Sequence, residues 1–583
     1  MALRVTHSTL TAVSSAPTPV HLPLTASTPL RERLWNTLPL ALSLFLASSI
    51  LWAPYFAPWA FAIGITAFFG YWLIRSYSVA IACIVGLRRI ERWKATNWQA
   101  KYCEWLPGHA DASAWAWPRH MVIIPNYKES EDGLARTLES LANQANAEQL
   151  VIVMAMEERE PGAHAKAATL IMRFRTSFAD MFATYHPAGL PNETPGKGSN
   201  EAWAAREAHI RLIERGRQDI DRFTITSCDA DAVFHRHHFE ALNFLFLSSE
   251  DRYRTFWQPA IFNSNNIWDI PAPLRIPDGL SGINRMSNLV MPGSVAFPTS
   301  CYSLSWQMLH AVDYWDEEVI PEDWHIFLKC SFTLGERVRV RPLLLPLGND
   351  CVLTDGWFKT LRAHYAQSVR HAWGASDIPY AWRATLNRQS PLPMKRKLTL
   401  AAAVSKVHSF WMAQWYLVTL GVFLPSKLAG SFGAPLPQWW THRIPVPGPG
   451  WHPEKIADPS AWFAFDKDGL VEGTMWLNVP GILVAVCIVP LIVMALFEYR
   501  TRGPRPAHVS RLSAGLGFLM WPLMAVITFF FASMPALHAQ LKLASGKGLI
   551  YRVAEKGSKR QPVPAAAHHA MNEPEPLGAA GGQ

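Results

Sequence analysis

Two aspartates one residue apart, Asp229 and Asp231, lie in the stretch SCDADAVF, directly after the β-branched run FTITS. An Asp-x-Asp pair at the end of a buried strand can hold a divalent cation, because Mg²⁺ and Mn²⁺ prefer oxygen ligands such as carboxylates. The same pair also occurs by chance in solvated turns. Its meaning therefore depends on the other reactive side chains of the chain.

Five further motifs combine acidic, basic and aromatic residues, and with CDAD (228–231) they occur in this order: IIPNYKE (123–129), MEERE (156–160), PGKGSNEA (195–202), CDAD, PEDW (321–324) and QSVRHAW (367–373). A positioned carboxylate such as Asp323 can take the proton of an attacking hydroxyl. Glu322 is its rival, and both can instead simply stabilise a helix N-terminus. Arg370 can pair with phosphate oxygens through its planar guanidinium group.

The elements that must position these motifs are short apolar runs alternating with helix-like stretches. MVIIP, LVIVMAM and FTITS predict strands, and EDGLARTLESLANQ predicts a helix. Strands alternating with helices predict an α/β domain with a mostly parallel sheet, whose ligands bind beyond the carboxyl ends of the strands. Several of the motifs follow those ends.

Composition indicates a membrane protein. Half of the 583 residues are hydrophobic, 26 are Trp, and 17% are charged, against roughly 25% in soluble domains. The nine excess positive charges gather beside apolar runs, which favours membrane lipids over nucleic acid as partners. The seven cysteines form no CxxC or zinc-like spacing and are expected to be reduced thiols.

The apolar runs predict five segments of the chain: a flexible tail (1–33), a transmembrane helical hairpin (34–98), a cytosolic catalytic domain (99–397), a C-terminal transmembrane region (398–537) with a Pro- and Trp-rich loop (425–473), and a basic, then disordered tail (538–583).

The number of crossings is left open by the sequence. Three apolar runs follow the catalytic domain, at 407–424, 481–497 and 512–534. Three crossings would place the basic tail outside, against the positive-inside rule. Either one run does not cross or the long loop holds another membrane element, and Pro522 and Pro535 make the last run the suspect.

In this order, the six motifs resemble the membrane-integrated family 2 glycosyltransferases with a GT-A fold, a group that includes cellulose and hyaluronan synthases and ceramide glucosyltransferase-like enzymes. The resemblance covers most of residues 120–375. It implies an inverting enzyme of the inner or plasma membrane that moves a sugar from a nucleotide-sugar donor, UDP- or GDP-linked, to a lipid-linked or glycan acceptor. Mg²⁺ or Mn²⁺ would neutralise the leaving diphosphate.

The resemblance also implies roles for single residues. Asp323 would be the catalytic base and Asp231 the direct metal ligand, with Asp229 either near the ribose or sharing the metal. The nucleotide-sugar would be bound by Tyr127, Glu129, Glu157, Lys197, Asp229, Gln367, Arg370 and Trp373. The family pattern Gln-x-x-Arg-Trp is altered here, because His371 stands at the tryptophan position and Trp373 follows two positions later.

Two alternatives stay open. A processive polysaccharide synthase would share most of these motifs, although His371 and the modest membrane portion favour addition of a single sugar. A transporter or membrane scaffold with a degenerate domain is the non-enzymatic alternative. Ionisable residues within the apolar runs and internal repeats would support it, but Arg75 is the main such residue and no repeat is seen.

Overall fold

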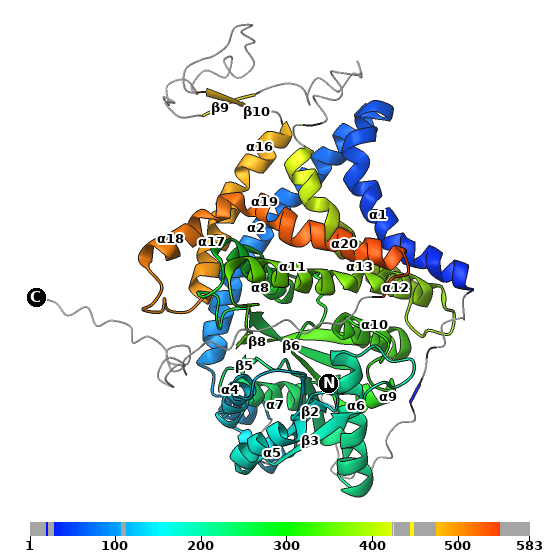
Figure 1. Cartoon of the computed structure of the whole chain (residues 1–583), viewed down its shortest axis with the longest axis vertical. Coiled ribbons are helices and arrows are strands. Elements are labelled where there is room, and N and C mark those ends of the chain that lie inside the picture. Colours follow the sequence, from blue (N-terminus) through cyan, green and yellow to red (C-terminus); the bar gives the residue numbers. More distant parts are fainter. Residues whose placement is uncertain are drawn as a thin grey trace, which may run out of the picture.

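The computed structural model of the chain describes residues 28–106, 112–421, 444–447, 474–477 and 479–548, and the single residues 19, 20, 22 and 424. Within these residues, an α/β domain lies below long apolar helices that come from both ends of the chain (Figure 1). This architecture confirms the predicted fold class.

Eight strands form one sheet in the order β3-β2-β1-β4-β7-β6-β8-β5. Their bounds are β1 Arg119–Asn126, β2 Leu150–Glu157, β3 Asp180–His186, β4 Phe223–Ser227, β5 Val233–Phe234, β6 Thr255–Phe262, β7 Tyr302–Ser305 and β8 Arg339–Gly348. Strand β1 pairs in parallel with β2 and β4, whereas β7 is antiparallel to β4 and β6. The sheet is therefore mostly parallel around β1, as the alternation predicted.

Both faces of the sheet are buried. Met121 and Ile123 of β1 belong to one apolar core, and Val122 and Ile124 belong to the core on the opposite face. The first face is covered by α6 Lys197–Ala208, α9 Trp306–Ala311, α10 Glu322–Leu334 and α12 Asp377–Leu386, and the second by α3 Trp98–Trp105, α4 Glu131–Ala142, α5 Ala163–Phe174 and α7 His238–Ser248. Because both faces are covered, the central strands read as continuous apolar runs.

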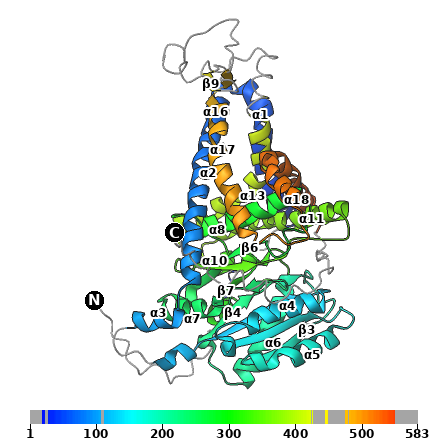
Figure 2. The ribbon, with the colours of Figure 1, turned by 90° about the vertical axis from the view of Figure 1, so that its left-hand side faces the viewer.

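Two helices, α8 (Arg275–Val290) and α11 (Trp357–Ala372), lie between the sheet and the upright helices (Figure 2). An apolar cluster joins Phe262 of β6 and Met286 of α8 to residues of the membrane region, including Val79 and Phe497. The sheet and the membrane region thus share a core.

Four helical segments are long and apolar enough to cross a membrane: Pro29–Phe56, Pro58–Lys94, Gly481–Thr501 and Arg511–Ala544. The first two are α1 and α2, and the third consists of α16 (Val479–Val486) and α17 (Ile488–Thr501). By length and composition they are candidate membrane spans, as expected for a multi-pass membrane protein. The predicted run 407–424 lies largely in α13 (Met394–Leu420), which is upright beside α1 but is not among the four.

The fourth segment is broken into α18 (Arg511–Leu519), α19 (Met524–Thr528) and α20 (Met534–Ala544). A proline at position 522 lacks the N–H that a continuous helix needs. Figure 1 shows α20 running across the molecule beside α11, rather than parallel to α2.

The tail 538–583 was predicted to be basic at first and then disordered. Helix α20 extends to Ala544, into the basic part of this tail. Most of the loop 425–473 and the tails 1–27 and 549–583 lie outside the described residues. The loop is followed by β10 (Thr474–Leu477), which pairs antiparallel with β9 (Ile444–Pro447) inside it.

Candidate active site

The Asp-x-Asp pair lies at the carboxyl edge of the sheet. Strand β4 ends at Ser227, and Asp229 and Asp231 follow in the loop before β5, which is tied to β8. Strand β1 is the parallel neighbour of β4, so the loops after both strands open on the same edge.

The carboxylate of Asp229 is bound by three groups of the chain. Its Oδ1 lies 2.9 Å from Nζ of Lys197, and its Oδ2 accepts hydrogen bonds from Asn349 Nδ2 at 3.1 Å and from the hydroxyl of Ser300. This carboxylate is therefore held in a fixed orientation by one cation and two neutral donors.

Asp231 is 5% exposed and lies among further oxygen-bearing groups. Its Oδ2 accepts the backbone N–H of Asp350 at 2.7 Å, and Asn265 bridges the Asp231 carbonyl and the Asp350 carboxylate. Oδ2 of Asp350 pairs with Arg136 at 2.6 Å. Hard oxygen donors are thus gathered around Asp231.

This donor set fits Mg²⁺ or Mn²⁺ better than a soft metal. Burial raises the pKa of the neighbouring Cys228 thiol well above its usual value, so this group stays protonated and is a poor ligand. Among the described residues, no group of three or more His, Cys, Asp or Glu side chains is arranged to hold a metal. Mg²⁺ commonly uses only one or two carboxylates together with substrate phosphates, so the pair is sufficient for a site of that kind.

Asp323 lies in the first turn of α10 and faces the same group of residues. Its Oδ2 accepts the backbone N–H of Ser300 at 3.2 Å, and its Oδ1 accepts the N–H of Trp324 at 2.8 Å. Burial and the adjacent Glu322 raise the pKa of Asp323 to about 7, against the opposing charge of Lys197 and these two N–H groups. A carboxyl group with a pKa near neutrality is suited to take a proton.

Lys197 connects Asp229 to the base of α10. In addition to its ion pair with Asp229, its ammonium group lies 3.1 Å from Glu322 and donates to the Ser300 carbonyl at 2.6 Å. The nearby charges of Asp229 and Glu322 outweigh the cost of burial and raise the pKa of Lys197 well above its usual value. Lys197 therefore stays charged within the site.

The residues predicted to bind the nucleotide lie at the carboxyl ends of β1 and β2. The guanidinium of Arg159 lies 4.3 Å from the centre of the Tyr127 ring, and Nε of Arg159 pairs with the buried Glu157 at 2.9 Å. Glu129 accepts the backbone N–H of Tyr127 at 2.5 Å, and Nδ1 of His186, at the end of β3, lies 3.5 Å from Glu157. The structure thus brings Tyr127, Glu129 and Glu157 together.

Helix α11 carries the QSVRHAW motif. Gln367 and Arg370 are half-buried, and His371 is on the exposed side of the helix. The charges of Arg370, Arg285 and Asp229 all reach the His371 ring. The exposed end of α11 is therefore within electrostatic range of the Asp-x-Asp loop.

Trp373, predicted at the nucleotide-sugar, is 9% exposed and packs in an apolar cluster with Val369, Met412, Ala536 and Leu543. It is the first residue of the 3₁₀ turn that follows α11, and it lies in the contact with α13 and α20.

Residues 224–432 match the family model described as Glycosyl transferase family group 2. The matched range includes Asp229, Asp231, Asp323 and the QSVRHAW motif. The chain carries a family 2 glycosyltransferase domain. This finding confirms the family and the GT-A-like fold that the six motifs predicted, and with them an enzyme that transfers a sugar from a nucleotide-sugar.

No curated protein matches the sequence. Among solved structures, the mannosyltransferase PcManGT from Pyrobaculum calidifontis, in complex with GDP-Man and Mn²⁺, is similar at 15% sequence identity and a TM-score of 0.37, with 76% of this chain and 99% of that chain covered.

Three residues of the candidate site were not predicted from the sequence. Ser300 contacts Lys197, Asp229 and Asp323, but it lies outside every motif. Arg285 of α8 interacts electrostatically with Asp229 and Asp323. Buried Glu201 accepts a hydrogen bond of 2.6 Å from Ser227. Of the three, Glu201 alone lies within one of the six motifs, PGKGSNEA, and could have been proposed from the sequence.

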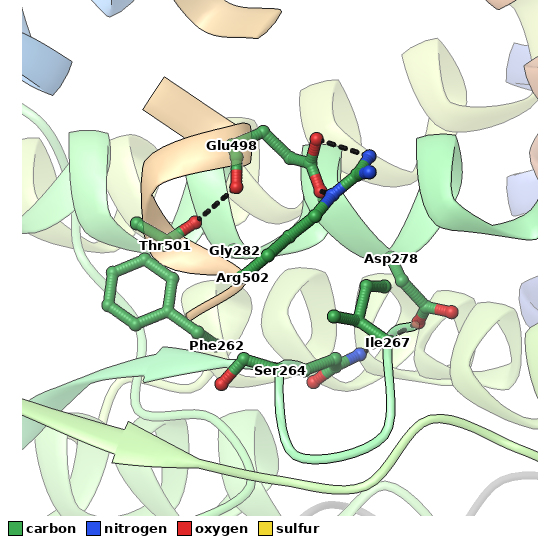
Figure 3. A pocket seen from close by; sticks show the side chains of 10 residues that line it. Phe262, Ser264, Ile267, Asp278, Gly282, Glu498, Thr501 and Arg502 are labelled. Carbon is green, nitrogen blue, oxygen red and sulfur yellow. Dashed lines mark hydrogen bonds and ion pairs between the residues drawn. The ribbon is translucent and has the colours of Figure 1, made fainter. Parts of the chain in front are cut away.

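A pocket of the glycosyltransferase lies beside this site, where the end of β6 meets α8 and the end of α17 (Figure 3). It is lined by Asp278, by Asn263 and by the buried ion pair of Glu498 with Arg502, among others. Asn263 donates to Asp278 at 2.8 Å and accepts from Arg285 at 2.9 Å. The polar wall of the pocket thus orients Arg285. The described lining includes none of the predicted site residues.

Proposed function

We propose that this chain is an inverting, metal-dependent glycosyltransferase that moves a sugar from a nucleotide-sugar to a lipid-linked acceptor at a cell membrane. The observation that carries the proposal is one hydrogen-bonded group at the carboxyl edge of the sheet, in which Lys197 and Ser300 join Asp229 to Asp323. Asp231 lies two residues from Asp229 in the same loop.

The donor would lie along this edge of the sheet. Its diphosphate carries negative charge, and Lys197, Arg285 and Arg370 supply positive charge close to Asp229. Its base would lie near the Tyr127 ring and the Glu157 carboxylate. Both a UDP-linked and a GDP-linked sugar fit these groups.

Asp231 would hold Mg²⁺ or Mn²⁺, which when bound would act as a Lewis acid toward the leaving diphosphate. We assign direct ligation to Asp231, because three groups of the chain already bind the Asp229 carboxylate. Asp229 would orient Lys197 and the donor. Asn265 and Asp350 would hold the Asp231 loop in place.

Asp323 would accept the proton of the acceptor hydroxyl as that hydroxyl attacks the anomeric carbon. A pKa of about 7 leaves a substantial fraction of this carboxylate ionised at neutral pH. Direct displacement needs one base and no protein nucleophile, so inversion at the anomeric carbon follows from this assignment.

The acceptor would enter from the membrane side. Helices α8 and α11 lie between the sheet and the upright helices (Figure 2). Arg285 of α8 and His371 of α11 are within electrostatic range of Asp229. Addition of a single sugar is favoured over processive synthesis, because Trp373 is buried in the apolar cluster and offers no open ring face for a sugar chain.

The catalytic domain would face the cytosol. Helix α2 ends with Arg92 and Lys94 on the side of the domain, in agreement with the positive-inside rule. If α1, α2, α13 and α16–α17 cross while residues 511–544 lie along the membrane surface, both chain ends are on the cytosolic side. This arrangement removes the conflict over the basic tail.

The test uses the purified full chain in detergent with UDP-glucose, UDP-N-acetylglucosamine and GDP-mannose, each with Mg²⁺ or Mn²⁺ and a lipid extract as acceptor. Release of nucleoside diphosphate and a new glycolipid seen by mass spectrometry would support the proposal. Asp231→Asn and Asp323→Asn should abolish both signals, whereas Glu139→Gln, on the exposed face of α4, should not. If the wild type uses no donor, or if both aspartate variants stay active, the enzyme assignment fails.

A further inference from the structure

His325 is buried in α10, two residues after Asp323, and is 6% exposed. Its Nδ1 lies 2.7 Å from Oδ1 of Asp377, and its Nε2 lies 2.9 Å from Oδ2 of Asp316. A carboxylate accepts hydrogen bonds, so both ring nitrogens act as donors only when the ring is the imidazolium cation. The set Asp316, His325 and Asp377 is called the His325 bridge below.

The charges around the bridge are balanced. Lys329, one turn further along α10, lies 2.5 Å from Oδ1 of Asp316, and the Tyr380 ring of α12 lies 4.2 Å from the imidazole. Burial alone would lower the pKa of His325, but Asp377 and Asp316 raise it to about 9. The burial of Asp316 is likewise outweighed by His325 and Lys329, which hold its pKa well below its usual range. Burial raises the pKa of Asp377, against the opposing charge of His325. In the ionised bridge, the cations His325 and Lys329 lie beside the anions Asp316 and Asp377.

The bridge connects two parts of the site that are distant in the sequence. Asp377 is the first residue of α12, and a short 3₁₀ turn (Trp373–Ser376) separates it from the end of α11, which carries Arg370. The other end of the bridge is on α10, whose first turn carries Asp323. A single side chain thus ties the helix of the expected base to the end of the helix of the expected diphosphate-binding arginine.

Trp324 stiffens the same turn of α10. Its ring stacks on Phe297 at 4.2 Å and contacts His408 of α13 at 5.3 Å. Phe297 precedes Ser300 by three residues, and Ser300 donates to Asp323. The three residues after Glu322 therefore make contacts in different directions. Asp323 faces the site, Trp324 packs toward α13, and His325 forms a hydrogen bond with Asp377 of α12.

We propose that His325 is a positioning residue, whose imidazolium bridge to Asp316 and Asp377 fixes the distance between Asp323 and the Arg370 helix. The inference rests on the proposed function, because it takes Asp323 as the base. A bridge of this kind affects the rate of transfer more than donor binding, because its loss changes the position of Asp323 relative to the donor, while Lys197 and Tyr127, which would also bind the donor, are held by other contacts.

The test compares His325→Gln and Asp377→Asn with wild type, using the full chain and the nucleotide-sugar of the panel that the wild type turns over. An error of about 1 Å in the placement of reacting groups can cost about 10²-fold in rate. We therefore expect kcat to fall by about 30- to 100-fold in each variant, with the donor KM within about threefold of wild type. The double variant should be no worse than either single one, because the residues share one interaction.

The pH profile gives a readout that a purely structural role would not move. Asp316, Lys329, Asp377 and Tyr380 are the titratable groups that face the ring. In the wild type, kcat should fall above about pH 9, where His325 loses its proton. In His325→Gln this alkaline limb should be absent, while the acid limb near pH 7 remains.

His120→Gln is a matched control. His120 is also buried and bonded through both nitrogens, to Thr224 at 2.8 Å and to Asn243 at 3.3 Å, but it lies at the opposite end of β1 from the site. This variant should lower the melting temperature without changing kcat.

The inference is overturned if His325→Gln lowers only the melting temperature, as His120→Gln should, or raises only the donor KM. If His325→Gln does not fold, the nearly isosteric Asp377→Asn decides by the same criteria. Asp323→Asn separates the two proposals: if it is active, the assigned base is wrong, whereas if it is inactive and His325→Gln is normal, only the bridge is wrong.

Discussion

The backbone N–H of Ser300 lies 3.2 Å from Oδ2 of Asp323 and donates a hydrogen bond to it. The hydroxyl of the same residue donates to Asp229, and its carbonyl accepts from Lys197. One residue in a left-handed backbone conformation, with φ of 61°, therefore contacts both the expected base and the groups expected at the diphosphate.

Replacement of Ser300 distinguishes the contribution of its hydroxyl group from that of its backbone conformation. Ser300→Ala and Ser300→Gly both lose the hydroxyl bond to Asp229, and a hydrogen bond to a charged group contributes about 1.5–3 kcal/mol. We expect kcat/KM to fall by about 10- to 100-fold in both variants. Ser300→Gly should melt at a higher temperature than Ser300→Ala, because glycine adopts positive φ without strain. Equal activity of wild type and Ser300→Ala would show that the hydroxyl is dispensable.

The pH dependence of the reaction should report the environment of Asp323. This carboxyl must be ionised to accept a proton, so kcat/KM should rise with pH through about 7 and level off above it. Glu322 raises this pKa, and its removal also leaves the charge of Lys197 less compensated. In Glu322→Gln the acid limb should therefore move to lower pH. An unchanged limb would assign it to another group.

Metal dependence should separate the two aspartates of CDAD. Chelation with EDTA should remove activity, and Mn²⁺ or Mg²⁺ should restore it. Asp231→Asn should weaken Mn²⁺-dependent binding of the nucleoside diphosphate by about 100-fold, since a ligand of the ion is lost. Asp229→Asn should weaken it less and should retain the metal dependence. Isothermal titration with and without Mn²⁺ measures both effects, and the reverse order would exchange the two assignments.

Trp373 should matter for stability rather than for substrate binding. Removal of a buried aromatic side chain costs about 3–5 kcal/mol of unfolding free energy, so Trp373→Ala should lower the melting temperature. Trp373→Phe, which keeps most of the apolar volume, should retain the wild-type donor KM and acceptor KM. A large rise in the acceptor KM of Trp373→Phe, with an unchanged melting temperature, would return Trp373 to the acceptor site.

The sequence predicted those features that leave a local pattern, such as an apolar run or a short motif of reactive residues. Strands β1, β2 and β4 are buried on both faces and could be recognised as apolar runs, and the order of the six motifs indicated the family. Ser300 and Arg285 could not be found in this way. Their contacts are to residues far away in the chain, and neither the short motifs nor the periodicity record the tertiary pairing of β4 with β7, which brings Ser300 to Asp229.

Trp373 illustrates a different limit of prediction from sequence. An aromatic residue near a predicted sugar site is equally suited to packing, and the helix register decides between the two. His371 is within electrostatic range of Asp229, whereas Trp373, the first residue after α11, packs toward α13 and α20. The partners that decide this packing lie outside the motif, and α20 comes from a part of the chain more than a hundred residues later.

The apolar cluster around Phe262 and Met286 also has a consequence for the order of synthesis. Its partners include Phe497 of α17, which leaves the ribosome well after the last strand, β8, has been made. A nascent chain that ends before residue 488 would expose this surface of β6 and α8 to water or to a chaperone. Proteolysis of ribosome-arrested chains should therefore find α8 only partly protected, by α2, until α17 has been made, so the packing of this domain is completed late although it is encoded in the middle.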